Sequence, residues 1–304
     1  MRALLPRPFQ LALTLALAMS LAPLAHADLC GTGQLDILLT NDDGCQAAGI
    51  RALYAKLRAA GHRVVLVAPD RNASGSSASL TWGNVAVTRD ASDPNVFGIS
   101  GTPSTAVALG ATALYPPGAR PDLVVSGINS GANAGSLLVL SGTVGAALAG
   151  TMLLDPPVPG LAISAERAGA GTAPALPEDH LDQVATHAAS VIAATRTWFC
   201  KHDDASRART VLNVNYPARP VAELRGTVVA SQGHSSALHV RFEATGADEY
   251  TARPAEKTAA ADDRDADVTW LEKGYVTVSP IEARLQAGSP ATRDLEQSLR
   301  KLRP

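Results

Sequence analysis

Two adjacent carboxylates follow the first apolar run beyond the amino-terminal region. The run Ile37–Leu39 is typical of a buried strand, and it leads into Asn41, Asp42, Asp43 and Gly44. In open α/β sheets, ligands bind beyond the carboxyl ends of the strands, so Asp42 and Asp43 stand where chemistry is expected. A purely structural alternative exists, because Asn and Asp are also ordinary turn and helix-cap residues.

Two further predicted strand ends carry oxygen-bearing side chains. The strand predicted at Val64–Ala68 leads into a polar loop that contains Ser74, and the strand predicted at Pro121–Val125 leads into a loop that contains Asn129. Carboxylate, hydroxyl and amide oxygens are ligands for hard cations such as Mg²⁺ or Mn²⁺. Zinc is less favoured, because the histidines show no i, i+4 ligand motif. The candidate cation ligands are Asp42, Asp43, Ser74 and Asn129.

A third feature is a candidate phosphate site. Ser141, Gly142 and Thr143 immediately precede a small-residue helix predicted at Val144–Leu154. The amino end of a helix offers unpaired N–H groups and a partial positive charge, both of which suit phosphate. Ser141 could instead serve only as the N-cap. Nucleophilic catalysis by a serine ranks lower, because the chain has no Gly-x-Ser-x-Gly elbow.

The elements that must position these residues alternate between strands and helices. This order predicts an α/β fold, a Rossmann-like three-layer sandwich with a mostly parallel sheet. From residue 221 the pattern changes to strand-like pieces at 227–230 and 238–242 and a charged, Ala-rich stretch, which predicts a protruding carboxyl-terminal hairpin arm. We expect an α/β core at 28–220, the arm at 221–269, and a strand and a final helix, near 293–302, within 270–304. Further strands are predicted at 85–87, 96–99, 159–164, 211–214 and 274–278, and further helices at 50–57, 103–114 and 178–199.

The amino terminus has the three parts of a secretory signal. A basic start is followed by an apolar run and by Ala25-His26-Ala27, which predicts cleavage after Ala27 and export, with the bacterial periplasm as the expected compartment. We expect no membrane span after cleavage. Removal of Arg2 and Arg7 from the 26 basic residues leaves 24 against 28 acidic ones. This acidic balance argues against a nucleic-acid duplex as partner.

The chain has three cysteines, so an oxidising compartment permits one disulfide and leaves one thiol. Cys30 precedes the first predicted strand, and Cys200 ends a helix that leads into another strand, so both belong at the amino-end edge of the sheet. Cys45 belongs at the opposite edge. The topology therefore predicts a Cys30–Cys200 disulfide.

Several separated motifs together resemble the survival protein E (SurE) nucleotidase family. The resemblance covers most of residues 35–165 in order, and the stretch 272–280 is similar too. It implies metal-dependent hydrolysis of nucleoside 5′- and 3′-monophosphates, with some relatives acting on other phosphoesters or on short polyphosphate. The motifs are Ile37–Gly44, Val67–Gly75, Gly101–Pro103, Pro121–Gly131 and Ser141–Val144.

The resemblance also assigns roles. It implies that Asp42 and Asp43 are catalytic and bind one divalent cation per subunit together with Ser74 and Asn129. The cation would be Mg²⁺ or Mn²⁺, with Co²⁺ as a further candidate. Family members form homodimers or homotetramers by exchanging carboxyl-terminal elements. The implied phosphate-binding residues are Asn41, Asn133, Ser141, Gly142 and Thr143.

This chain departs from the family pattern at a few positions. The family commonly has an acidic residue at Thr105, an acidic pair at Ser136 and Leu137, Tyr at Leu140 and Glu at Ala149. None of these positions is a proposed cation ligand. Two alternative functions stay open: a broad-specificity acid phosphatase or polyphosphatase, and a non-catalytic nucleotide- or phosphate-binding protein.

Overall fold

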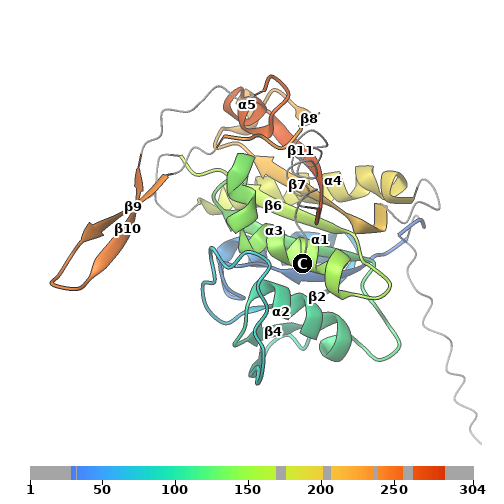
Figure 1. Cartoon of the computed structure of the whole chain (residues 1–304). Coiled ribbons are helices and arrows are strands. Elements are labelled where there is room, and N and C mark those ends of the chain that lie inside the picture. The colour runs from blue at the N-terminus through green and yellow to red at the C-terminus, as the bar shows by residue number, and fades with distance from the viewer. Residues whose placement is uncertain are drawn as a thin grey trace, which may run out of the picture.

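A nine-stranded sheet forms the centre of the molecule (Figure 1), with the strand order β3-β4-β2-β1-β5-β6-β7-β11-β8. The computed structural model describes residues 29–31, 33–168, 176–200, 207–235, 239–255 and 263–284. The expected signal segment and the expected final helix lie outside these ranges. The strands of the sheet are β1 Asp36–Thr40, β2 Arg63–Pro69, β3 Val87–Arg89, β4 Val96–Ile99, β5 Leu123–Ser130, β6 Gly160–Ala165, β7 Thr210–Tyr216, β8 Thr227–Val229 and β11 Val276–Glu282.

Most neighbouring strands run parallel, as the sequence predicts. The pairs β1–β2, β1–β5, β2–β4, β5–β6, β6–β7 and β11–β8 are parallel, whereas β3–β4 and β11–β7 are antiparallel. The strand predicted at 96–99 is confirmed by β4, whereas the strand predicted at 85–87 lies two residues later, as β3, and pairs antiparallel with β4 at the sheet edge. The mostly parallel sheet and its helices confirm the predicted α/β class.

Helices cover both faces of this sheet. On one face lie α1 (Ala48–Ala59) and α4 (Glu178–Cys200), and on the other lie α2 (Pro103–Leu109) and α3 (Gly142–Leu153) (Figure 1). A π-helical turn at Gly110–Leu114 continues α2. The short helix α5 is Asp267–Glu272.

The alternation of side chains along β1 determines the face of the sheet toward which Asp42 points. Ile37 and Leu39 are fully buried in the core with α1 and α4, whereas Leu38 is fully buried in the core with α2 and α3. Successive side chains of a strand point to opposite faces, so a strand buried on both faces is apolar throughout. Continued past the strand, this alternation directs Asp42 to the α3 side, where its hydrogen-bond partner Thr143 lies.

The second core strand, β5, is longer than its apolar part. The sequence predicts a loop from Ser126 onward, whereas the structure continues the strand to Ser130. The pairing of β5 with β6 shifts register between Ser126 and Asn129. Such an irregularity re-aims the residues that follow it, so Asn129 is held by the sheet and not by a free loop.

The segment 221–269, which we expect to be an arm, is divided in the structure. β8 lies at the edge of the main sheet, where Thr227–Val229 pair with Val276–Val278 of β11. The projecting part is the antiparallel hairpin of β9 (His239–Ala244) and β10 (Tyr250–Ala255), which stands away from the core in Figure 1. The reason is non-local: β8 finds a partner strand about fifty residues later in the chain.

The predicted disulfide is present between Cys30 and Cys200, with Cα atoms 5.1 Å apart. Arg196 of α4 also donates to the backbone carbonyls of Leu29 (3.3 Å) and Gly33 (2.6 Å). Both contacts fasten the chain before β1 to the end of α4. Cys45 is the remaining thiol, and it is buried and unbridged.

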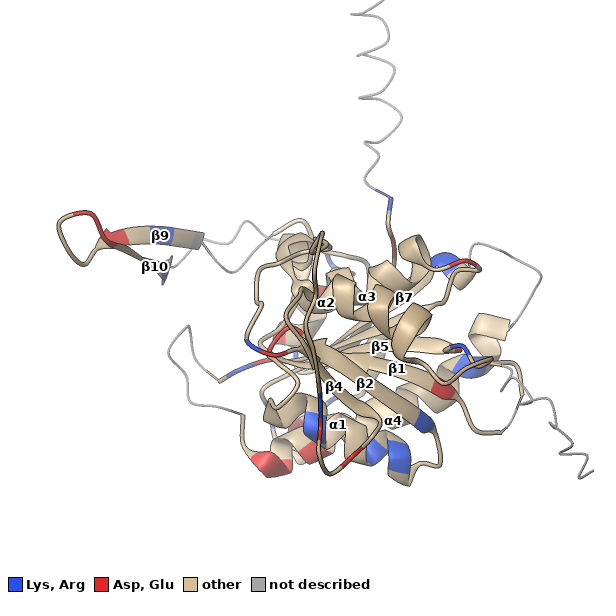
Figure 2. Cartoon of the chain, turned by 90° about the horizontal axis from the view of Figure 1, so that it is seen from below, with Lys and Arg blue, Asp and Glu red and all other residues tan. Residues whose placement is uncertain are grey.

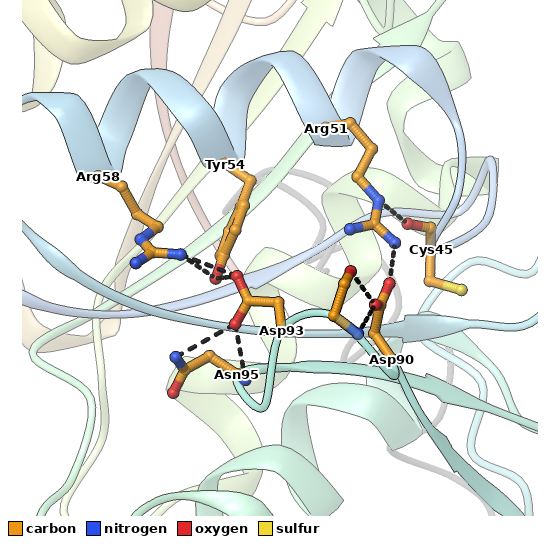
Figure 3. Close-up of polar contacts among 8 residues, drawn as sticks. Cys45, Arg51, Tyr54, Arg58, Asp90, Asp93 and Asn95 are labelled. Carbon is orange, nitrogen blue, oxygen red and sulfur yellow. Dashed lines mark hydrogen bonds and ion pairs between the residues drawn. The ribbon is translucent and has the colours of Figure 1, made fainter.

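Helix α1 holds the turn that follows β1. Arg51 donates through Nε to the Cys45 carbonyl (2.9 Å) and through Nη2 to Asp90 (3.1 Å), as Figure 3 shows. About one and two turns later, Tyr54 and Arg58 both donate to Asp93, at 2.7 and 2.8 Å. These contacts tie α1 to the chain between β3 and β4. They thereby fix the first residues after the Asp pair.

The described surface carries charges of both signs. Figure 2 shows acidic and basic residues interspersed over the described helices and loops. Among the helices that the structure describes, none is both long enough and apolar enough to cross a bilayer.

Candidate active site

Asp42 is held by the amino end of α3. It is 3% exposed, Thr143 Oγ1 donates to its Oδ1 (2.6 Å), and the Thr143 backbone N–H donates to its Oδ2 (3.2 Å). Both carboxylate oxygens are therefore oriented by one residue. Each oxygen keeps a second lone pair for another ligand. This contact spans 101 residues of sequence and brings the acidic turn to the predicted phosphate site.

Asp43 points toward the end of β5. The backbone N–H of Ser130 donates to its Oδ2 (3.1 Å). Burial and, secondarily, the neighbouring Asp42 raise the pKa of Asp43 from 3.8 to about 6, although Ser130 and the charge of Arg167 oppose this rise. The raised pKa shows that the negative charge of Asp43 is unfavourable beside Asp42. A cation bound between the two carboxylates would offset their repulsion.

The loop after β2 lies directly against Asp42. The Ala73 backbone N–H donates to the Asp42 carbonyl (2.7 Å), so Ser74 is the next residue after a contact with the acidic turn. Ser74 is exposed, and its N–H donates to Asn72 Oδ1 (3.0 Å). The end of the same loop is fastened by the Ser77 N–H, which donates to the Leu140 carbonyl (3.2 Å).

Asn129 has a fixed side-chain amide. Its Nδ2 donates to the Gly131 carbonyl (2.8 Å), which leaves Oδ1 as the atom that can accept or coordinate. The next residue, Ser130, binds Asp43. The structure thus brings all four predicted cation ligands to the carboxyl ends of β1, β2 and β5.

A hard divalent cation fits this donor set. Within the described ranges, no three His, Cys, Asp or Glu side chains form a metal-binding group. The predicted ligand set would therefore consist of two carboxylates and the neutral oxygens of Ser74 and Asn129. An all-oxygen set with two formal negative charges suits Mg²⁺ or Mn²⁺ better than a softer metal.

The candidate phosphate residues divide into two groups. Ser141 is the N-cap of α3, because its Oγ accepts from the Val144 N–H (3.1 Å), as the structural alternative holds. Gly142 faces the acidic turn: a Cβ there would lie 2.9 Å from Asp42 Oδ2. Only glycine permits this approach. Ser141, Gly142 and Thr143 are therefore at the site, although Thr143 acts first on Asp42.

Asn41 and Asn133 use their side chains to build the surrounding backbone. Asn41 is fully buried, donates to the Gly44 carbonyl (3.0 Å) and accepts from the Gly44 N–H (3.2 Å). Asn133 donates through Nδ2 to Ser164 Oγ (2.9 Å), and its backbone N–H donates to Asn215 Oδ1 (2.7 Å). In this structure the Asn41 amide closes the acidic turn, and the Asn133 amide links its own loop to β6.

Arg167 is a site residue that the sequence reasoning missed. It lies two positions beyond the end of β6, and its positive charge lowers the pKa of Asp43 against the effect of burial. The register pairs Ser130 of β5 with Ala165 of β6, so the two strand ends are neighbours. In the sequence, Arg167 could have been found from its position three residues after the end of the strand predicted at 159–164, because ligands bind beyond the carboxyl ends of strands.

The departures from the family pattern lie in α2, in the 3-10 turn Gly135–Leu140 and in α3. Thr105 is buried at the start of α2, where its Oγ1 accepts from the Thr81 N–H (2.8 Å). Leu140 is 59% exposed beside the loop that carries Ser77. Ala149 is fully buried in the core, and Ser136 N–H donates to the Ser235 carbonyl (3.0 Å).

Comparison with known proteins places this geometry in a family. The model of the family described as survival protein SurE matches residues 37–238, which include every candidate site residue. The chain belongs to the SurE family. The resemblance of the motifs within residues 35–165 to the SurE family is thereby confirmed.

Curated SurE relatives match over most of their length. The 5′-nucleotidase SurE of Desulfovibrio desulfuricans is 36% identical over 251 residues, which cover 81% of this chain and 92% of that protein. The 5′/3′-nucleotidase SurE of Yersinia enterocolitica is 35% identical over 257 residues, covering 83% and 93%. The crystal structure of the SurE protein from Aquifex aeolicus matches with a TM-score of 0.67 and 28% identity, covering 86% of this chain and 99% of that one.

Proposed function

We propose that this protein hydrolyses nucleoside 5′- and 3′-monophosphates with the help of a divalent cation. The observation that carries the proposal is the convergence of Asp42 and Asp43 with the amino end of α3, fixed by the Thr143 contacts. A cation site and an anion site side by side are what a phosphomonoesterase requires. The names of the SurE relatives support nucleoside monophosphates as the substrates.

The protein's own residues divide the work. Asp42 and Asp43 would hold the cation together with the oxygens of Ser74 and Asn129. The amino end of α3 at Gly142 would orient the phosphate oxygens, because the helix dipole favours an anion there. Of the first three N–H groups of the helix, those of Thr143 and Val144 already donate to Asp42 Oδ2 and Ser141 Oγ, which leaves the Gly142 N–H for the phosphate. A divalent cation supplies charge stabilisation of the phosphoryl group and lowers the pKa of water.

We propose one cation per subunit, Mg²⁺ or Mn²⁺ with Co²⁺ as a further candidate. The donor set supports a hard ion, and the two carboxylates supply its charge balance. Phosphate release should therefore depend on added cation and be abolished by chelator.

A substrate panel tests this proposal. The protein is purified in the form that the producing cell yields, including any cleavage of its amino-terminal segment. Phosphate release from 5′- and 3′-AMP, p-nitrophenyl phosphate and short polyphosphate is measured with Mg²⁺, Mn²⁺ or Co²⁺, and again with excess chelator. We expect cation-dependent release that is fastest from the nucleotides. Equal rates on all substrates would indicate a broad phosphatase, and binding of AMP without release under every condition would indicate a non-catalytic binder.

We propose that the hairpin β9–β10 joins copies of this chain into a homodimer or homotetramer. Its exposed apolar side chains include Phe242 (69% exposed), Tyr250 (66%) and Val240 (56%). An isolated two-stranded hairpin is marginally stable in water, and exposed apolar groups of this kind mark interaction surfaces. Docking on a second copy would cover them.

We also propose that the protein works in an oxidising compartment, the periplasm of a bacterium. The disulfide between Cys30 and Cys200 supports this location, because disulfides persist where thiols are oxidised and are rare in the cytosol. Mass determination of the secreted or periplasmic fraction, compared with the cytosolic one, tests the location and the expected cleavage after Ala27.

A further inference from the structure

The candidate phosphate site has few side-chain donors left for a ligand. The Thr143 hydroxyl donates to Asp42 (2.6 Å). The amide groups of Asn41 and Asn133 donate to acceptors within the protein, at 3.0 and 2.9 Å. The side chains that the sequence predicts to contact phosphate are thus mostly committed to holding the site together.

Ser76 differs from all of these residues. Its Oγ is buried, and it has no hydrogen-bond partner among the described residues. It lies against the first residue of α3: a Cβ on Gly142 would be 2.6 Å from Ser76 Oγ and 2.9 Å from Asp42 Oδ2. A hydroxyl without a hydrogen-bond partner among the described residues therefore lies beside the first residue of α3 and near Asp42.

The position of Ser76 is fixed by contacts on both sides of it in the chain. Ala73 N–H donates to the Asp42 carbonyl (2.7 Å). Ser77 Oγ donates to the Val139 carbonyl (2.8 Å). A Cβ at Gly145 of α3 would collide with the Ser77 carbonyl, so the loop also packs closely on that helix. The hydroxyl is held in place by its neighbours, although it makes no bond itself.

An unpaired buried hydroxyl carries a desolvation cost that folding alone does not offset. Such a group in a native protein calls for an explanation, and a missing ligand is one. The neighbouring Asp42 carboxylate, a proposed cation ligand, and Gly142, the first residue of α3, mark the place where the phosphoryl group would sit. A hydroxyl can donate to a phosphoryl oxygen there.

We propose that Ser76 is a phosphate-binding residue whose hydroxyl donates a hydrogen bond to a phosphoryl oxygen of the substrate, beside Gly142. This inference rests on the proposed function, since it adds a residue to the same site. It concerns the phosphate and not the nucleoside. The contribution of Ser76 is therefore the same for a nucleotide, a simple phosphomonoester and inorganic phosphate.

The test compares Ser76→Ala with Ser79→Ala. Ser79 is an exposed serine of the same loop and supplies a matched loss of one hydroxyl. Calorimetric titration with inorganic phosphate, in the presence of Mg²⁺, measures binding without turnover. A hydrogen bond to a charged group corresponds to about a tenfold to hundredfold change in affinity, so Ser76→Ala should weaken phosphate binding by at least about tenfold. Ser79→Ala should bind like the parent protein.

Thermal unfolding separates ligand binding from a structural role. Removal of an unpartnered buried hydroxyl leaves no orphaned partner, so Ser76→Ala should have an unchanged or higher Tm without phosphate. Unchanged phosphate affinity in Ser76→Ala overturns the inference, as does a lowered Tm that accounts for the weakened binding. Failure of the proposed function is a different result: the parent protein would bind phosphate and release none from AMP.

Discussion

Replacement of Asp43 by Asn should stabilise the cation-free protein while abolishing its cation-dependent activity. Burial and the neighbouring Asp42 raise the pKa of Asp43 from 3.8 to about 6. Each pKa unit corresponds to about 1.4 kcal/mol, so ionised Asp43 costs the folded state about 3 kcal/mol. Asparagine keeps the size of the side chain and an oxygen that can accept from Ser130, but it has no charge to bury.

The sign follows from proton binding. Between about pH 4 and 6 the folded state holds a proton on Asp43 that the unfolded state has released, so stability falls as the pH rises through this window. The loss is complete above the folded pKa. The stability of Asp43→Asn has no such contribution, so the two proteins should be similarly stable near pH 4 and differ by about 3 kcal/mol at pH 8.

Denaturant unfolding with excess chelator, at several pH values from 4 to 8, measures this difference. Asp182→Asn serves as the control, because Asp182 is 66% exposed in a surface ion pair with Lys56, 2.7 Å away, and such pairs contribute little. A parallel assay of phosphate release tests the loss of activity. An Asp43→Asn protein that is no more stable at pH 8 than its parent would refute the account of burial. Full activity in that variant would refute the role in cation binding.

Three further changes should have distinct effects. Gly142→Ala would place a Cβ 2.9 Å from Asp42 Oδ2, so phosphate release should fall at least about a hundredfold, and near-parental kcat/KM would contradict the close approach. Joint replacement of Cys30 and Cys200 by Ala removes a disulfide between residues 170 apart in sequence. The free energy of unfolding should fall by about 2–4 kcal/mol relative to the oxidised parent protein, with activity retained at 25 °C. An unchanged free energy of unfolding would contradict a stabilising role of the disulfide. Phe242→Glu puts a charge on the exposed hairpin, so sedimentation should show a smaller assembly, whereas an unchanged assembly would exclude this face from the interface.

The centre of the fold and the main features of the site could be predicted from the sequence because their signals are local. Ile37–Leu39 is apolar on both faces, and this predicts a buried central strand that delivers Asp42 and Asp43 to a turn. The order of strands and helices also placed Cys30 and Cys200 at one edge of the sheet, and the disulfide agrees.

Other features depend on contacts between distant segments, which periodicity does not encode. The strand-like piece predicted at 227–230 is β8, but its place in the main sheet depends on pairing with β11, about fifty residues later in the chain. The polar end of β5 stays in the sheet after a shift of register. In the site, the hydrogen bond from Thr143 to Asp42 and the lack of a described partner for the Ser76 hydroxyl both follow from side-chain packing. The roles of Thr143 and Ser76 could therefore be inferred only from the structure.

A titration of the cation-free protein with Mn²⁺ tests the central claim most directly. Bound Mn²⁺ is measured by electron paramagnetic resonance, and phosphate release from AMP is measured on the same samples. We predict that activity rises in proportion to bound Mn²⁺ and saturates at one cation per subunit. At the Mn²⁺ concentrations that saturate the parent protein, Asp43→Asn should neither bind Mn²⁺ nor release phosphate from AMP. Phosphate release that persists in excess chelator, or that is unrelated to bound Mn²⁺, would contradict the assignment of the Asp42–Asp43 turn as a catalytic cation site.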